Sequence, residues 1–68
     1  MEITFTYQYF KDLDVLHCKS NKTGIEFDLR GLELERALKY LGIGVVDDKE
    51  HELTVSEKVW DNLLKGLF

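Results

Sequence analysis

The sequence has no proline and only one cysteine among its 68 residues. A single cysteine excludes an internal disulfide, whereas small secreted domains usually carry several. Cys18 and the two histidines also fall short of the four ligands of a common structural zinc site. We therefore expect a chain that folds without a disulfide or a metal, holds no cofactor and works in the reducing cytoplasm.

Long apolar runs are absent as well. Nothing in the sequence approaches the ~20 consecutive apolar residues of a membrane-spanning helix. The first ten residues, MEITFTYQYF, contain no lysine or arginine, so they do not have the basic start of a signal peptide. We therefore expect no signal peptide and no membrane partner.

Basic residues are in the minority, with nine Lys and Arg against thirteen Asp and Glu, which gives a formal net charge of −4. Segment 47–57 alone accounts for this value, because it contains five acidic residues and only one lysine. Affinity for nucleic acid depends on lysine and arginine displacing counterions from phosphates. The charge balance therefore argues against nucleic acid as the partner.

The apolar pattern predicts one α+β domain over residues 1–68. Residues 2–10 alternate strictly between apolar or aromatic and polar side chains, which is typical of a strand. Shorter apolar segments at 15–19 and 25–29, separated by polar clusters, predict two more strands. The first part of the chain should therefore form a three-stranded antiparallel meander.

Two helices are predicted after the meander. Leu34, Ala37, Leu38 and Leu41 have the spacing of one apolar helix stripe, and Gly42 is well placed to end that helix. Ser56 is a good N-cap for a second helix. Strands followed by helices predict an α+β domain in which both helices pack on one face of the sheet.

Residues 44–55, between the two predicted helices, leave two interpretations open. Val45-Val46 and the apolar residues of 53–55 flank the acidic run, so they could pair as a short acidic β-hairpin. The same segment could also be a plain acidic loop.

Several short motifs fail at the positions that their chemistry needs. The stretch HELTV at 51–55 begins like the zinc-protease signature, but Val55 occupies the place of the second histidine. Counted from Asp47 as a calcium loop, the glycine position holds Glu52 and the bidentate glutamate position holds Lys58. We therefore predict no metal site here.

The stretch DLRGLELERALKYLG, residues 28–42, is similar to the start of the MutS-related nuclease-like domain, in which an Asp-Leu-His/Arg-Gly turn joins a strand to a helix. That family also carries a His-Gly-x-Gly loop, and neither histidine of this chain is followed by glycine. The resemblance therefore implies a strand-to-helix connection and no nuclease activity.

His17 and Cys18 are adjacent, but neighbouring strand residues point to opposite faces of a sheet. They cannot bind one ion together, and the histidine cannot activate the thiol. We predict that Cys18 is a small core residue and that His17 is exposed or lightly packed. No catalytic set is recognised, so we predict that the protein is not an enzyme.

The remaining features favour a small protein-interaction module. We expect it to bind and modulate a protein partner, most readily by inhibition, as phage-type accessory proteins and inhibitors do. The acidic run could engage a basic surface, and aromatic side chains of the first strand could serve as a hot spot or pack in the core. The predicted partner-binding residues are Asp47, Asp48, Glu50, Glu52, Tyr7, Tyr9 and Phe10.

Two alternatives stay open. One is a nucleic-acid-binding module similar to a winged helix, with residues 45–55 as the wing. The other is a subunit that mainly self-associates into a homodimer, through a free edge of the aromatic strand at 2–10.

Overall fold

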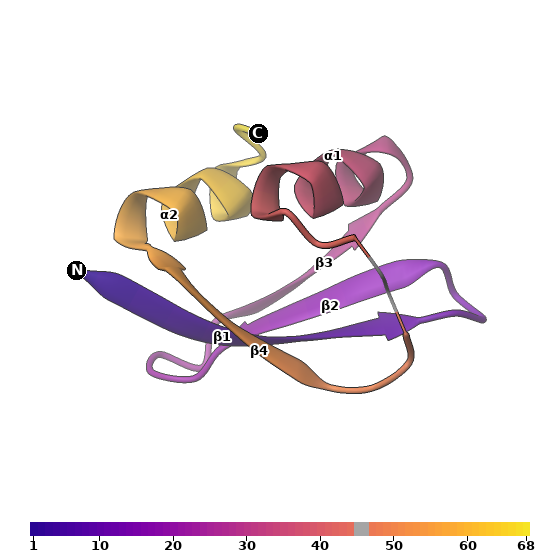
Figure 1. The fold of residues 1–68 in the computed structure, drawn as a ribbon, viewed down its shortest axis with the longest axis horizontal. Coiled ribbons are helices and arrows are strands. Elements are labelled where there is room, and N and C mark those ends of the chain that lie inside the picture. Colours follow the sequence, from indigo (N-terminus) through magenta and orange to yellow (C-terminus); the bar gives the residue numbers. More distant parts are fainter. Residues whose placement is uncertain (45–46) are drawn as a thin grey trace.

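The computed structural model describes residues 1–44 and 47–68. These residues form a four-stranded antiparallel sheet with the strand order β3-β2-β1-β4, and two helices cover one of its faces (Figure 1). The elements in chain order are β1 (Glu2–Phe10), β2 (Val15–Ser20), β3 (Glu26–Arg30), α1 (Leu32–Leu41), β4 (His51–Ser56) and α2 (Glu57–Lys65). The predicted α+β class is confirmed.

The meander β1-β2-β3 follows the alternation in the sequence. Phe5 of β1 lies opposite Ser20 of β2, and Cys18 of β2 lies opposite Phe27 of β3. The third strand begins at Glu26, one residue later than predicted. Ile25 remains in the turn, where its carbonyl oxygen accepts a hydrogen bond from the Ser20 N–H at 2.8 Å.

A fourth strand corrects the prediction of a three-stranded sheet. β4 pairs antiparallel with β1, from Glu2 opposite Ser56 to Tyr7 opposite His51. It satisfies backbone groups on the side of β1 that β2 does not reach, which is required where the backbone of a partly buried strand is shielded from water. The predicted hairpin arm at Val45-Val46 lies outside the described residues, and residues 47–50 form no strand.

The position of β4 also changes which strands are edges. The aromatic strand β1 is central, so the predicted free edge on this strand is wrong. The edges of the sheet are β3 and β4.

Helix α1 starts directly after β3. Gly31 precedes it with φ 63° and ψ −135°, a backbone conformation that side chains with a Cβ avoid. Leu34 and Ala37 are buried in the predicted stripe. The helix ends at the predicted Gly42, with φ 73°, and the Ile43 N–H donates to the Leu38 carbonyl at 2.9 Å, which is the hydrogen bond of a Schellman ending.

Helix α2 follows β4 without a loop. The Ser56 hydroxyl accepts a hydrogen bond from the Val59 N–H at 3.3 Å, so the predicted N-cap is confirmed. Trp60 and Leu63 are buried, whereas Leu64 in the same helix is exposed. The buried stripe of α2 is therefore narrow.

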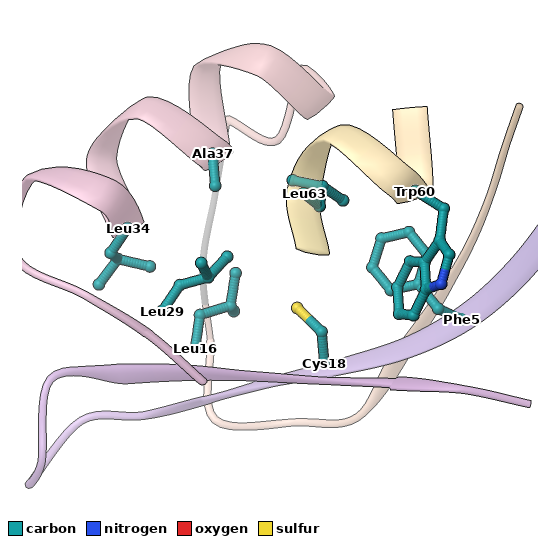
Figure 2. Packing of buried hydrophobic residues seen from close by; sticks show 8 residues of the cluster. All are labelled: Phe5, Leu16, Cys18, Leu29, Leu34, Ala37, Trp60 and Leu63. Carbon is teal, nitrogen blue, oxygen red and sulfur yellow. The ribbon is translucent and has the colours of Figure 1, made fainter. Parts of the chain in front are cut away.

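The core lies between the sheet and the two helices. Figure 2 shows Leu16, Cys18 and Leu29 pointing from the sheet toward Leu34, Ala37 and Leu63. The Trp60 ring packs between two sheet residues, with ring centroids 5.0 Å from Phe5 and 5.3 Å from Phe27. In the part of the chain that the structure describes, no helix is long and apolar enough to cross a membrane.

Candidate interaction surface

The helices leave one face of the sheet uncovered (Figure 1), and polar side chains of β1 and β4 form hydrogen bonds on that face. The hydroxyls of Thr4 and Thr54 share a hydrogen bond of 2.8 Å across β1 and β4. The Thr6 hydroxyl donates to the side-chain oxygen of Asn21 at 2.7 Å, and the Asn21 amide donates to Glu52 at 2.7 Å. Glu52 is therefore held on this face by a side-chain network.

His17 and Cys18 lie on opposite faces, as predicted. His17 Nδ1 donates to Asp28 at 2.6 Å on the uncovered face, and its Nε2 is 3.6 Å from Glu26. Cys18 is fully buried on the core side, where burial, with a smaller effect of the Asp28 charge, raises the pKa of its thiol to about 12. Within residues 1–44 and 47–68, no three His, Cys, Asp or Glu side chains gather as metal ligands would.

The acidic segment, residues Asp47–Glu52, is tied to the end of the sheet. Asp47 accepts hydrogen bonds from the His51 ring at 2.6 Å and from the Lys49 N–H at 3.0 Å. These two bonds, the one from His51 first, lower the pKa of Asp47 from its ordinary value. The Gln8 amide donates to the Asp48 carbonyl oxygen at 3.0 Å. The segment is thus ordered by hydrogen bonds to β1 and within itself.

The three predicted aromatic residues occupy different positions. Tyr7 is half-buried and its ring stacks on His51 with centroids 5.4 Å apart. The Tyr9 hydroxyl donates to Asp14 at 2.6 Å, and this bond is the main reason that the pKa of Tyr9 is raised. Phe10 is 39% exposed and meets the edge of the His17 ring.

The structure brings the end of β1 and the acidic segment together at one end of the molecule (Figure 1). One hollow is lined by Tyr9, Lys11, Asp47 and Asp48. A neighbouring hollow is lined by residues 8–13 and Asp48. A third groove lies on the uncovered face and is lined by Thr6, Gln8, His17, Lys19, Asn21 and Glu50.

We name the residues 10–14 and 47–50 the acidic end. It contains five carboxylates (Asp12, Asp14, Asp47, Asp48 and Glu50) and two lysines (Lys11 and Lys49), a net charge of −3. Of the predicted site residues, the structure places Asp47, Asp48, Glu50, Tyr9 and Phe10 in or beside it. Glu52 lies outside the acidic end, where it accepts a hydrogen bond from Asn21. Tyr7 supports the acidic segment by stacking on His51.

Sequence reasoning missed Leu13 in this surface. The side chain is 72% exposed and lines the same hollow as Phe10 and Asp48. The signal in the sequence was an apolar residue inside the polar turn KDLD. Turns lie at the protein surface, so an apolar side chain in this turn is expected to be exposed.

Comparisons with protein-family models, with curated proteins and with solved structures found no match. The function of this chain therefore has to be inferred from its own residues.

Proposed function

We propose that this chain is a small, non-catalytic interaction module that binds a basic surface of a protein partner through the acidic end. Binding would modulate the partner, most simply by inhibiting it through occlusion of that surface. The observation that carries the proposal is the hollow in which exposed Phe10 and Leu13 lie beside Asp48. Protein interfaces usually have an apolar core within a polar rim.

Hydrogen bonds hold the acidic end in a defined conformation, and this supports the same proposal. Asp48 is held through its carbonyl by Gln8, and Asp47 is held by His51 and Lys49. A segment that is already ordered loses less conformational entropy when it binds. In the described part of the chain, the side chains of Asp48 and Glu50 have no hydrogen-bond partner, so they are available to lysine or arginine of the partner.

The roles of the other predicted residues follow from their contacts. Tyr9 would line the binding surface, because its ring borders the hollow with Asp47 and Asp48. Tyr7 and Glu52 would act as supports, because each is engaged by a neighbour inside the protein. We place the protein in the cytoplasm, on the single cysteine and the lack of any disulfide that it entails.

The experiment compares capture from a lysate of the native host by three immobilised proteins. These are the wild type, the double variant Asp48→Lys/Glu50→Lys, and the control Glu2→Lys/Asp61→Lys. Both variants change the net charge by the same amount, but the control changes exposed residues outside the acidic end. We expect a protein that the wild type and the control retain and the acidic-end variant loses, with retention falling as salt rises.

Equal capture by the two variants would contradict the proposed surface. A separate variant, Leu13→Ser, tests the apolar anchor without changing charge, and it should weaken the same interaction. Loss of binding in the control as well would mean that only the overall charge matters.

No observation favours the winged-helix alternative. Residues 51–55, which would belong to the wing, lie in the edge strand β4, and Glu52 adds negative charge there. Binding of duplex DNA at low salt, with an affinity that falls steeply as salt rises, would support that alternative over the present proposal.

A further inference from the structure

The outer edge of β3 has backbone groups that point away from the sheet. The Ser20 N–H donates to the Ile25 carbonyl, and the register pairs Cys18 with Phe27 and Leu16 with Leu29. In an antiparallel pair, residues alternate between facing the neighbouring strand and facing away from it. The N–H and C=O groups of Glu26, Asp28 and Arg30 therefore point outward.

The side chains of the same three residues lie on the uncovered face and are exposed. Their charges along the strand are negative, negative and positive. If a second β3 pairs antiparallel about a two-fold axis at Asp28, each Glu26 lies opposite Arg30 of the other copy. Opposite charges in directly facing cross-strand positions stabilise a pair. The edge is thus complementary to itself in this register, which is also the one that pairs all three residues with outward backbone groups.

Helix α1 adds apolar surface beside this edge. Leu32 of α1 is 69% exposed beside the end of β3, and Ile25, in the turn before β3, is 47% exposed at the other end of the strand. Leu32 also lines a hollow on α1 with Glu35, Arg36, Leu38 and Lys39. On the other flank of α1, Tyr40 contacts Phe68 and Asn62 at the α2 side. The hollow therefore lies on a part of α1 that faces away from α2, and its mixed charges suit a second α1.

The other edge of the sheet offers no such match. The register of β1 and β4, read with the same alternation, turns Glu52, Thr54 and Ser56 outward. These residues include one negative charge and no positive charge. Two copies of β4 therefore cannot form facing ion pairs in any register.

We propose that two copies of this chain associate through their β3 edges, so that one continuous antiparallel sheet runs through both copies. Three pairs face each other across the edge: two of Glu26 with Arg30 and one of Asp28 with Asp28. Each pair would exchange two backbone hydrogen bonds. Both α1 helices would lie on the same side of that sheet and bury Leu32 between them. The association does not rest on the function proposed above, because it uses a different strand from the acidic segment.

One contact in this arrangement is unfavourable. At the two-fold axis, Asp28 of one copy faces Asp28 of the other, and like charges directly opposite destabilise a strand pair. The His17 ring, which donates to Asp28 at 2.6 Å, offsets part of this repulsion. The arrangement consequently predicts that Asp28→Asn strengthens the dimer.

The experiment measures the dimer dissociation constant by sedimentation over a range of protein concentrations. Glu26→Arg and Arg30→Glu should each weaken the dimer by roughly ten-fold, because each replaces two attractive pairs with two repulsive ones. The double variant Glu26→Arg/Arg30→Glu should restore it, since the facing charges are opposite again. Lys58→Glu on α2 is the control and should leave the dissociation constant unchanged.

Circular dichroism would verify that each variant folds before its association is compared. A wild type that stays monomeric at high micromolar concentration would overturn the proposal. A dimer that neither single reversal weakens, or that the double variant fails to restore, would also overturn it.

Discussion

The ring of His51 stacks on the ring of Tyr7, with centroids 5.4 Å apart and an angle of 26° between their planes. The same imidazole reaches Asp47 with its Nε2 at 2.6 Å. His51 therefore joins the acidic segment to the central strand β1. The contact shows why residues 47–50 remain ordered at the sheet end without forming a strand of their own.

Removal of His51 should raise the pKa of Asp47 toward its ordinary value of 3.8, because the bond from His51 is the largest cause of the lowered pKa. We expect His51→Ala to show this rise in an NMR titration of the side-chain carboxyl carbon, and His17→Ala to leave the pKa unchanged. A carboxylate with a lowered folded-state pKa stabilises the fold above the unfolded-state pKa, and this contribution is lost as the pH falls through the folded-state pKa. If the pKa of Asp47 stays low in His51→Ala, the contact is not its cause.

The thiol of Cys18 should be unreactive in the folded protein. Its side chain is fully buried and its pKa is raised to about 12, so almost none of it is thiolate near neutral pH. We expect negligible labelling by a thiol reagent at about pH 8, and complete labelling once the protein is unfolded in urea. Rapid labelling of the native protein would show that this part of the core opens easily.

Trp60→Ala should destabilise the fold by about 3–5 kcal/mol, because the indole is buried between Phe5 and Phe27. Urea unfolding monitored by circular dichroism measures this difference in free energy. Leu67→Ala is the control, since that side chain is 64% exposed and should change stability by less than about 0.5 kcal/mol. Similar losses in the two variants would be incompatible with Trp60 as the centre of the core.

Gly31→Ala should destabilise the fold by about 1–3 kcal/mol, since φ 63° with ψ −135° is strained for any residue with a Cβ. No atom lies within 4 Å of the added Cβ, so the effect should come from the backbone alone. Gly44→Ala provides the comparison, because Gly44 also has open space and is not among the glycines with positive φ. Equal stability of the two variants in thermal unfolding would refute this explanation of the β3-to-α1 connection.

Local patterns were sufficient for most of the fold. Alternation predicted β1 and β3, a short apolar segment predicted β2, and the apolar spacing with Gly42 predicted α1 and its ending. A strand at 53–55 was one of two open interpretations, as the arm of a short hairpin, but its pairing with β1 was not predicted, although Leu53 and Val55 alternate with Glu52 and Thr54. The alternation in a short segment does not indicate which strand the segment pairs with. Glu2 lies opposite Ser56 only because the chain returns to the side of β1 after α1.

The interaction surface was predicted only in part, because it too joins segments that are far apart in the sequence. The concentration of acidic residues in 47–52 is visible in the sequence, and so is the aromatic character of β1. Their meeting around Asp48 depends on the path between α1 and β4, and the exposure of Leu13 depends on how the turn after Phe10 is oriented.

By itself, the amino-acid sequence determined the α+β class, the meander, the end of α1, the N-cap of α2 and the sign of the net charge. These properties depend on side chains that are close neighbours along the chain. Only the tertiary structure decided that β1 is central, that β3 is an edge with self-complementary charges, and that the acidic segment lies beside Phe10 and Leu13. Those relationships join residues far apart in sequence, and their free energy comes from backbone pairing and burial that exist only once the whole sheet has formed.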